Sequence, residues 1–225
     1  SYCCNHALAR LAPGTYVRFR SPDNIVEEIR EIATRNPARR EFYLEVESFG
    51  INKEWAIELC SRLEGLNKVL TNPLSFGVNL RVTPNANFED LFAACKRANF
   101  SYLNIGLESG SERIRREILR RNYSNRDMVN AVCLARKYGL KVALHVMIGV
   151  PGETIADFWE TVKITRICSP DWLYTYILFP YPGTDLHFLC KERGLLKEPI
   201  DTHMERQKAN LDLPGFSKKR IQNSY

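Results

Sequence analysis

The chain has 225 residues, of which 44% are hydrophobic and 26% are charged, and its formal net charge at pH 7 is +6. This length and composition exclude a disulfide-stapled mini-protein, a collagen-like chain and a disordered chain, and they predict one large domain or two small ones. The mild basic excess suits anionic ligands without indicating nucleic acid. No apolar run approaches the roughly 20 residues that span a bilayer. We therefore expect a cytoplasmic protein without a membrane span.

Seven cysteines are spread along the chain, most of them singly within apolar helical patterns. Such a distribution is unlike the disulfide framework of a secreted protein and favours a reducing compartment. Five of them are predicted to be small buried residues in helices, namely Cys60, Cys95, Cys133, Cys168 and Cys190. The sequence opens with Ser1, Tyr2, Cys3 and Cys4 and has no initiator methionine. We therefore expect that the chain is cut at this end.

Helices and strands alternate along the sequence from residue 21 onward. Ser21 supplies an N-cap and Pro22 a first helical residue for a helix that continues to about Arg35. Further helices are predicted at residues 53–63, 87–98, 111–121, 125–138, 155–168 and 185–193. Strands are predicted at residues 42–46, 77–83, 102–108, 141–150 and 172–178. This alternation predicts an α/β fold in which βαβ crossovers build a parallel sheet.

The predicted strands have two chemically different faces. Leu103, Ile105 and Leu107 share one face of their strand, and Asn104 and Glu108 lie on the other. The apolar face is expected to pack against outer helices, whereas the polar face must meet water or a ligand. Polar groups also gather at the carboxyl ends of the strands, where parallel α/β sheets place their ligands. The sequence therefore predicts a binding cavity on the inner side of the sheet.

Three short motifs follow these strands in order. They read GLESGSE at residues 106–112, IGVPGET at residues 148–154 and FPYPGT at residues 179–184. Together they resemble the core of radical S-adenosylmethionine (SAM) enzymes, in the branch whose members often carry an upstream cobalamin-binding domain. The resemblance implies an incomplete (β/α)6 TIM-like barrel over residues 1–196 with its first strand missing. Residues 197–225 are expected to be a polar C-terminal tail or the start of a further element.

The opening residues gain a meaning from this resemblance. Family members bind a [4Fe-4S] cluster with cysteines spaced C-x-x-x-C-x-aromatic-C, and the fourth iron is left to chelate SAM. Tyr2 and Cys3 resemble the end of that signature, which implies a chain truncated inside the cluster loop. On this interpretation Cys3 is a metal ligand, and Tyr2 lies beside the adenine of SAM. The alternative is that Cys3 and Cys4 are ordinary terminal thiols.

Acidic and basic side chains near the strand ends are candidates for contacts to the methionine end of SAM. The resemblance implies that Glu47, or else Glu45, receives the SAM amino group through a charge-assisted hydrogen bond. Arg81 is a candidate for bidentate binding of the SAM carboxylate, because a guanidinium inside a barrel must be paired. The structural alternatives are a solvated glutamate pair on an edge strand and an internal ion pair of Arg81 with a glutamate.

Residues of the first two motifs are candidates for contacts to the nucleoside. The resemblance implies that Glu108 bonds the ribose hydroxyls, with Ser109 nearby. Gly149 and Gly152 would let the backbone approach the flat adenine, and Val150 would add an apolar contact. The alternative for Glu108 is a carboxylate that stabilises the N-terminus of the next helix.

His145 is the one candidate for a catalytic side chain. Its ring is predicted to face the cavity, where it could touch substrate or transfer a proton near neutral pH. The alternative is a core histidine whose hydrogen bonds are satisfied within the protein.

The resemblance implies that a reduced [4Fe-4S] cluster cleaves SAM to methionine and a 5′-deoxyadenosyl radical, which abstracts hydrogen from an unidentified small-molecule or macromolecular substrate. Methyl transfer or cyclisation could follow. An electron donor such as flavodoxin or ferredoxin is expected, and cobalamin could be held by a missing upstream domain. The piece given by this sequence is expected to be inactive by itself.

Two other functions fit parts of the same sequence. One is a barrel enzyme without iron that uses Glu108, Arg81 and His145 for acid-base catalysis. The other is a scaffold or binding protein that has the fold but no cluster.

Overall fold

The computed structural model describes residues 2–11, 14–196, 200 and 202–225, except for the side chains of His6, Ala7 and Glu47. Within these residues a parallel sheet contains five strands in the order β1-β2-β3-β4-β5. The strands are β1 Glu41–Phe49, β2 Ser75–Leu80, β3 Phe100–Glu108, β4 Lys141–Ile148 and β5 Trp172–Ile177. Each lies at a predicted position, and the expected α/β fold with a partial barrel is confirmed.

Helices connect the strands and flank the sheet. They are α1 Asn5–Leu11, α2 Pro22–Arg35, α3 Lys53–Val69, α4 Glu89–Arg97, α5 Glu112–Glu117, α6 Asn125–Lys137, α7 Ile155–Cys168, α8 Asp185–Glu192 and α9 Lys218–Ser224. The helix α3 is longer than predicted because Leu66 continues its buried face by another turn. The helices α1 and α9 were not predicted, since each has only seven residues and too few turns to show a period.

Hydroxyl side chains fix where the helices after the strands begin. Ser124 and Thr154 each form a capping box with the aspartate three residues later. In each box the hydroxyl accepts the N–H of the aspartate, and the aspartate side chain accepts the N–H of the capping residue. Ser111 and Thr184 cap α5 and α8 in the simpler way, each accepting one backbone N–H. The loops at the carboxyl ends of the strands therefore end at defined residues.

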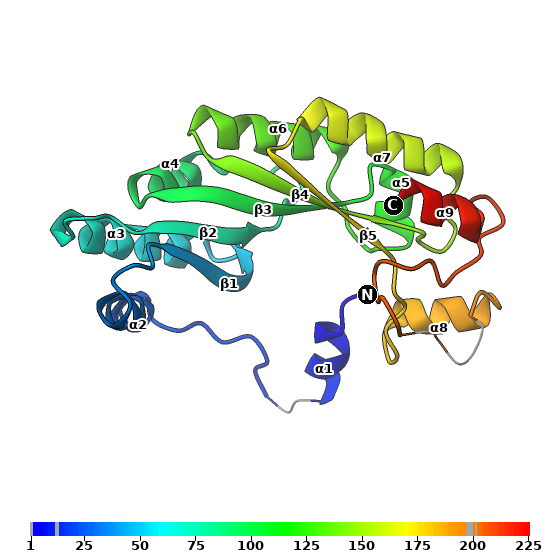
Figure 1. Ribbon diagram of the computed structural model, residues 1–225, viewed down its shortest axis with the longest axis horizontal. Helices are drawn as coiled ribbons and strands as arrows, with labels where there is room; N and C mark the ends of the chain where they lie inside the picture. The colour runs from blue at the N-terminus through cyan, green and yellow to red at the C-terminus, as the bar shows by residue number, and fades with distance from the viewer. Residues whose placement is uncertain (1, 12–13, 197–199, 201) are drawn as a thin grey trace.

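The outer face of the sheet forms the hydrophobic core. Leu103, Ile105 and Leu107 of β3 are fully buried, and Figure 1 shows α4, α6 and α7 along this side of the sheet. Each such side chain contributes about 2 kcal/mol by its removal from water. The prediction of an apolar face packed against outer helices is confirmed.

The inner face carries aromatic and amide side chains. The rings of Tyr43 and Tyr102 stack with centroids 6.1 Å apart, and Asn104 Nδ2 donates to Tyr43 Oη at 2.9 Å. Tyr174 on β5 remains 46% exposed and Trp172 43%. A lumen lined in this way differs from the aliphatic interior of a closed barrel.

The strand β1 pairs irregularly with β2 near its carboxyl end. Leu44 lies opposite Val78, but the next pair is Phe49 with Leu80, so β1 contains three more residues than β2 between these pairs. The bulge lets Phe49 bury its ring on the outer side, where it packs against Phe100. The regular alternation of side chains between the two faces of β1 therefore ends before residue 45.

The C-terminal segment, residues 202–225, packs onto β4 and β5. Buried apolar side chains anchor it, namely Ala209, Leu211, Leu213, Phe216 and Ile221. The N–H of Ile177 donates to the carbonyl of Arg206 at 2.7 Å, which ties this segment to β5. The boundary at residue 196 stays a prediction. Of the helices that the structure describes, none is both long enough and apolar enough to cross a membrane.

We expect Gly110→Ala to destabilise the fold by about 3 kcal/mol, because overpacking against rigid backbone cannot relax. A Cβ at Gly110 would lie 2.4 Å from Thr161 Cα and 2.5 Å from the carbonyl oxygen of Glu160 in α7. The measurement is the free energy of unfolding in urea. The matched control is Gly65→Ala in α3, where a Cβ meets nothing within 4 Å and stability should rise by about 0.5–1 kcal/mol. Equal stability of Gly110→Ala and the wild type would contradict the packing described.

Candidate functional site

Glu108, at the carboxyl end of β3, is held in an unusual backbone conformation. Its φ of 59° lies in the left-handed region, which residues with a Cβ rarely adopt. Its carboxylate folds back over Gly106, where an added Cβ would lie 2.5 Å from Glu108 Oε1. The side chain is only 18% exposed. Strained, largely buried carboxylates of this kind are typical of functional sites.

Tyr2 and Arg121 surround this carboxylate. Tyr2 Oη donates to Glu108 Oε1 at 2.6 Å, and Arg121 Nη2 donates to Tyr2 Oη at 2.6 Å. Arg121 Nη2 also lies 3.8 Å from Glu108 Oε1. Arg81 directly follows β2 and is exposed; it forms no ion pair with Glu108 in the described residues, although its charge acts on that carboxylate. We call Tyr2, Arg81, Glu108 and Arg121 the Glu108 cluster.

Burial and charge oppose each other in the Glu108 cluster. Burial raises the pKa of Glu108, while the Tyr2 hydrogen bond and the charges of Arg121 and Arg81 act to lower it. Burial and the neighbouring Glu108 raise the pKa of Tyr2, so its hydroxyl keeps its proton and remains a donor. Burial and the nearby Arg121 lower the pKa of Arg81. Two guanidinium groups beside one carboxylate leave a positive excess that suits an anionic ligand group.

Cys3 adjoins this cluster through its neighbour Tyr2. Its side chain is partly buried, whereas Cys4 is exposed. Among the residues that the structure describes, no group of three or more His, Cys, Asp or Glu side chains is arranged to hold a metal ion. A [4Fe-4S] cluster takes its ligands mainly from cysteine thiolates. The described residues therefore do not complete such a site by themselves.

Of the two predicted glutamates on β1, the structure describes only the side chain of Glu45. Glu45 is exposed within the irregular part of β1. Burial raises the pKa of Tyr43, and the negative charge of Glu45 adds to this rise. The side chain of Glu47 lies outside the described residues. Their roles stay predictions.

The second motif forms a turn whose amides are bonded by a buried carboxylate. Gly149 and Gly152 both have positive φ, 78° and 83°. Glu153 Oε2 accepts from the N–H of Gly149 at 2.6 Å and from that of Val150 at 3.0 Å. Glu153 Oε1 is buried and has no hydrogen-bond partner among the described residues. Burial raises the pKa of Glu153 to about 7.

Ser109 lies in the protein interior, where the end of β3 meets α7. It is fully buried, its hydroxyl lies 3.4 Å from Thr161 Oγ1, and it accepts the N–H of Ser111 at 3.2 Å. These contacts tie the end of β3 to α7. A direct contact of the Ser109 side chain with a ligand stays a prediction.

His145 lies on the inner face, opposite Gly106 in the pairing of β3 with β4. Its ring stacks on Tyr174 and Tyr176, and its Nδ1 lies 3.2 Å from Tyr176 Oη. Burial lowers the pKa of His145, so the imidazole is neutral at pH 7. Its Nε2 is buried without a hydrogen-bond partner in the described residues. One ring nitrogen is thus engaged by the protein and the other is left for a further contact.

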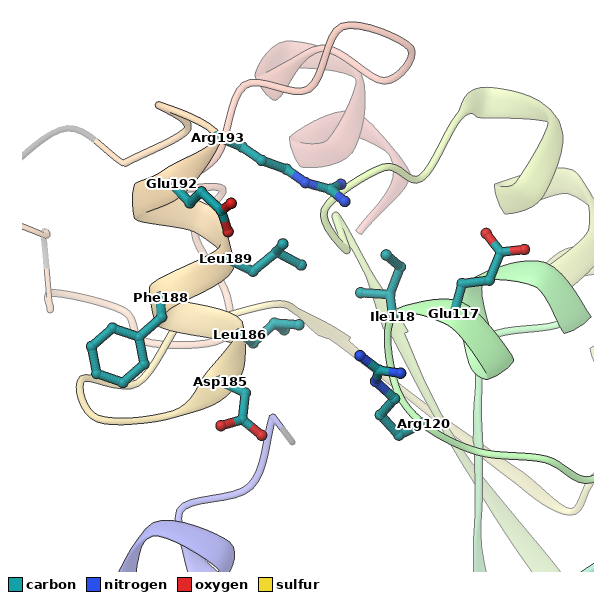
Figure 2. Close-up of a pocket in the computed structure, with 9 residues that line it drawn as sticks. All are labelled: Glu117, Ile118, Arg120, Asp185, Leu186, Phe188, Leu189, Glu192 and Arg193. Carbon is teal, nitrogen blue, oxygen red and sulfur yellow. The ribbon is translucent and has the colours of Figure 1, made fainter.

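A pocket of about 380 Å³ lies between α5 and α8 (Figure 2). Leu186 and Leu189 point toward Ile118 across it, while Arg120 and Arg193 project toward its two ends. The remaining residues of its wall are Glu117, Asp185, Phe188 and Glu192. None of the residues predicted from the sequence as ligands lines this pocket. Its wall includes Arg120, the residue directly before Arg121 of the Glu108 cluster.

Sequence reasoning missed three residues around the site. Arg121 and Tyr123 lie in the loop after α5. The clue was an aromatic residue directly before the N-cap Ser124, with an arginine two residues further upstream. Glu153 belongs to the second motif, but no role was predicted for it. Its isolation among apolar and glycine residues could have marked it as buried.

We expect Glu153→Gln to change how stability depends on pH. Because the folded pKa of Glu153 is about 7, against an ordinary 4.5, its protonated form stabilises the fold. That contribution is complete below about pH 4.5 and is lost as the pH rises to about 7. Relative to Glu153→Gln, the free energy of unfolding of the wild type should fall over this interval by on the order of 3 kcal/mol. Urea denaturation at a series of pH values measures it.

The matched control for this experiment is Glu54→Gln, which removes a carboxylate from an exposed position in α3. Parallel stability curves for the wild type and Glu153→Gln across this pH interval would contradict the buried, protonated state of Glu153.

Comparisons with known proteins give the fold a family. Residues 1–164 match the model of the Radical SAM superfamily. The chain is 28% identical over 185 residues to an uncharacterized methyltransferase of Pyrococcus horikoshii. This match covers 81% of this chain and 38% of the relative. It is 26% identical over 204 residues to a tRNA-2-methylthio-N(6)-dimethylallyladenosine synthase of Moorella thermoacetica, covering 84% of this chain and 44% of that one. The chain spans less than half the length of these relatives.

Solved structures show the same fold. The radical S-adenosylmethionine methyltransferase TsrM of Kitasatospora setae, with cobalamin and a [4Fe-4S] cluster bound, has a TM-score of 0.68 at 16% identity, covering 91% of this chain and 41% of that one. Coproporphyrinogen III oxidase of Escherichia coli, a radical SAM enzyme, has a TM-score of 0.59 at 15% identity. This match covers 90% of this chain and 44% of that one. Because the family model matches well over half of its residues, this chain belongs to the radical SAM superfamily.

Proposed function

We propose that this chain is the SAM-binding core of an enzyme that cleaves SAM reductively to methionine and a 5′-deoxyadenosyl radical, which abstracts hydrogen from a substrate. The observation that carries the proposal is the Glu108 cluster. It presents a carboxylate and two guanidinium groups at the carboxyl end of a parallel sheet, next to Cys3, in a chain of this family. SAM offers matching groups, namely ribose hydroxyls and a carboxylate.

Each charged residue of the cluster has a role in this proposal. Glu108 accepts hydrogen bonds from the ribose hydroxyls, and such bonds to an ionised acceptor are stronger than neutral ones. Arg121 and Arg81 hold the SAM carboxylate, because a guanidinium presents paired donors that match a carboxylate. Glu47 and Glu45 are the candidates for the SAM ammonium.

The turn at residues 149–152 is proposed to line the adenine. The buried carboxylate of Glu153 bonds the N–H groups of Gly149 and Val150, which fixes the backbone that would lie along the ring. Gly152 has no Cβ and completes the turn. Ser109 supports this region from the interior through its contact with Thr161.

Cys3 is proposed to be one thiolate ligand of a [4Fe-4S] cluster, which supplies the electron for SAM cleavage when it is bound. The described residues place one partly buried thiol next to Tyr2, so the proposal requires two further thiolates from elsewhere in the protein. A flavodoxin or ferredoxin is the proposed electron donor. The reducing cytoplasm is the proposed location, since thiolate ligands must stay reduced there.

Methyl or methylthio transfer is the proposed outcome of the reaction. The printed names of the two curated relatives, a methyltransferase and a methylthio synthase, support it. Cobalamin is proposed as a further cofactor bound outside this chain, because TsrM contains it and shares the fold.

The test is anaerobic reconstitution of the full-length protein with iron and sulfide, followed by addition of SAM and a strong reductant. We expect the visible absorbance of an iron-sulfur cluster to appear. We also expect 5′-deoxyadenosine to form, measured by chromatography. Cys3→Ser should abolish both, because a cluster ligand is lost. Comparing reactions with and without added cobalamin then shows whether methyl transfer from SAM depends on cobalamin.

The matched control is Cys133→Ser on α6. Cys133 is exposed, so the prediction that it is buried was wrong, and it is far from Tyr2 in sequence. This variant should reconstitute like the wild type. A full-length protein that forms no cluster and yields no 5′-deoxyadenosine would instead favour a scaffold that has kept the fold.

A further inference from the structure

The backbone around Glu108 needs an explanation, because a glutamate gains nothing locally from a left-handed conformation. Its φ is 59°, a region that costs free energy for any residue with a Cβ. The pairing of β3 with β4 also slips here. Gly106 lies opposite His145 and Glu108 opposite Val146, so β3 contains one extra residue. A bulge of this kind re-aims the side chain that follows it.

Tyr123 bonds the carbonyl groups that precede Glu108. Its hydroxyl donates to the carbonyl oxygens of Gly106 at 3.0 Å and of Leu107 at 2.9 Å. The ring is 4% exposed. Burial and the nearby Glu108 raise the pKa of Tyr123, so the hydroxyl keeps the proton that it donates. The carbonyls displaced by the bulge thereby gain a donor.

Arg115 bonds the carbonyl group that follows Glu108. Its side chain is fully buried, and Nη1 donates to the carbonyl oxygen of Ser109 at 2.5 Å. Nη2 donates to the carbonyl oxygen of Tyr123 at 3.3 Å, and the guanidinium lies 4.8 Å from the centroid of the Tyr123 ring. Tyr123 and Arg115 thus act as one unit and hold the backbone on both sides of Glu108.

We propose that Tyr123 is a positioning residue for SAM: it fixes the bulged backbone at Glu108 so that the carboxylate meets the ribose hydroxyls, and Arg115 holds Tyr123 in place. This inference rests on the proposed role of Glu108 in binding ribose. Tyr123 does not itself touch SAM. Its effect on affinity passes through the direction of one carboxylate, and therefore concerns the ribose hydroxyls alone.

The experiment compares two probes by calorimetry on the full-length protein, S-adenosylhomocysteine and its 2′,3′-dideoxy analogue. The wild type should bind the first about 10- to 100-fold more tightly, the effect of hydrogen bonds to a charged acceptor. Tyr123→Phe removes only the hydroxyl, so it should reduce this preference at least about fivefold. Its affinity for the dideoxy analogue should stay unchanged. General damage to the fold would weaken both probes alike.

Two further variants keep the outcomes separate. Tyr138→Phe is the matched control, because it also removes a tyrosine hydroxyl that donates a hydrogen bond, here to Glu89 Oε1 of α4 at 2.6 Å and away from the site. It should keep the wild-type preference. Glu108→Gln should lose the preference. If Glu108→Gln loses it while Tyr123→Phe retains it, the positioning role is overturned and the ribose contact stands. If Glu108→Gln retains it, the ribose contact is wrong, and the role of Tyr123 falls with it.

Discussion

A carboxylate taken out of water must be met by donors and positive charge, and the end of β3 is built around that requirement. Glu108 is largely buried, and its neighbours come from separate parts of the chain, with Tyr2 before the first strand and Arg121 after α5. Burial raises the pKa of Glu108, and the Tyr2 hydroxyl and the guanidinium charges act against that rise, which favours the charged acceptor. The surrounding architecture serves to bring these groups to one edge of the sheet.

A second buried polar network keeps that edge rigid. Asp157 at the start of α7 accepts from Ser111 Oγ at 2.6 Å and from Arg113 Nη2 at 2.6 Å, and it closes the capping box of Thr154. Burial alone would raise the pKa of Asp157, but these hydrogen bonds hold it below its usual value. The networks of α5 and α7 are therefore joined, and the loops of the first two motifs are held at a fixed separation. Gly110 permits this close approach, because α7 backbone occupies the place of its Cβ.

The sequence was sufficient for the features that depend on periodicity and on local capping. Alternating Leu103, Ile105 and Leu107 correctly predicted a strand with a buried outer face, since period-two patterns report burial directly. The bulges at residues 45–48 and at Leu107 were not predictable, because they arise from pairing between strands. Arg121 and Tyr123 were missed for a related reason. They act across the fold on backbone atoms and on a residue more than 100 positions away, and no local pattern encodes such a contact.

The link between Tyr2 and Glu108 joins residues separated by 106 positions. During synthesis the ribosome makes Tyr2 and Cys3 long before β3 and α5 exist, so the N-terminal segment has no partner while the first βα units form. Closing so long a loop is entropically costly, and contacts of this range form late when a chain folds. The two halves of the Glu108 cluster can therefore meet only after β3 and the loop that follows α5 have emerged, so the cluster is completed late however early Tyr2 is made.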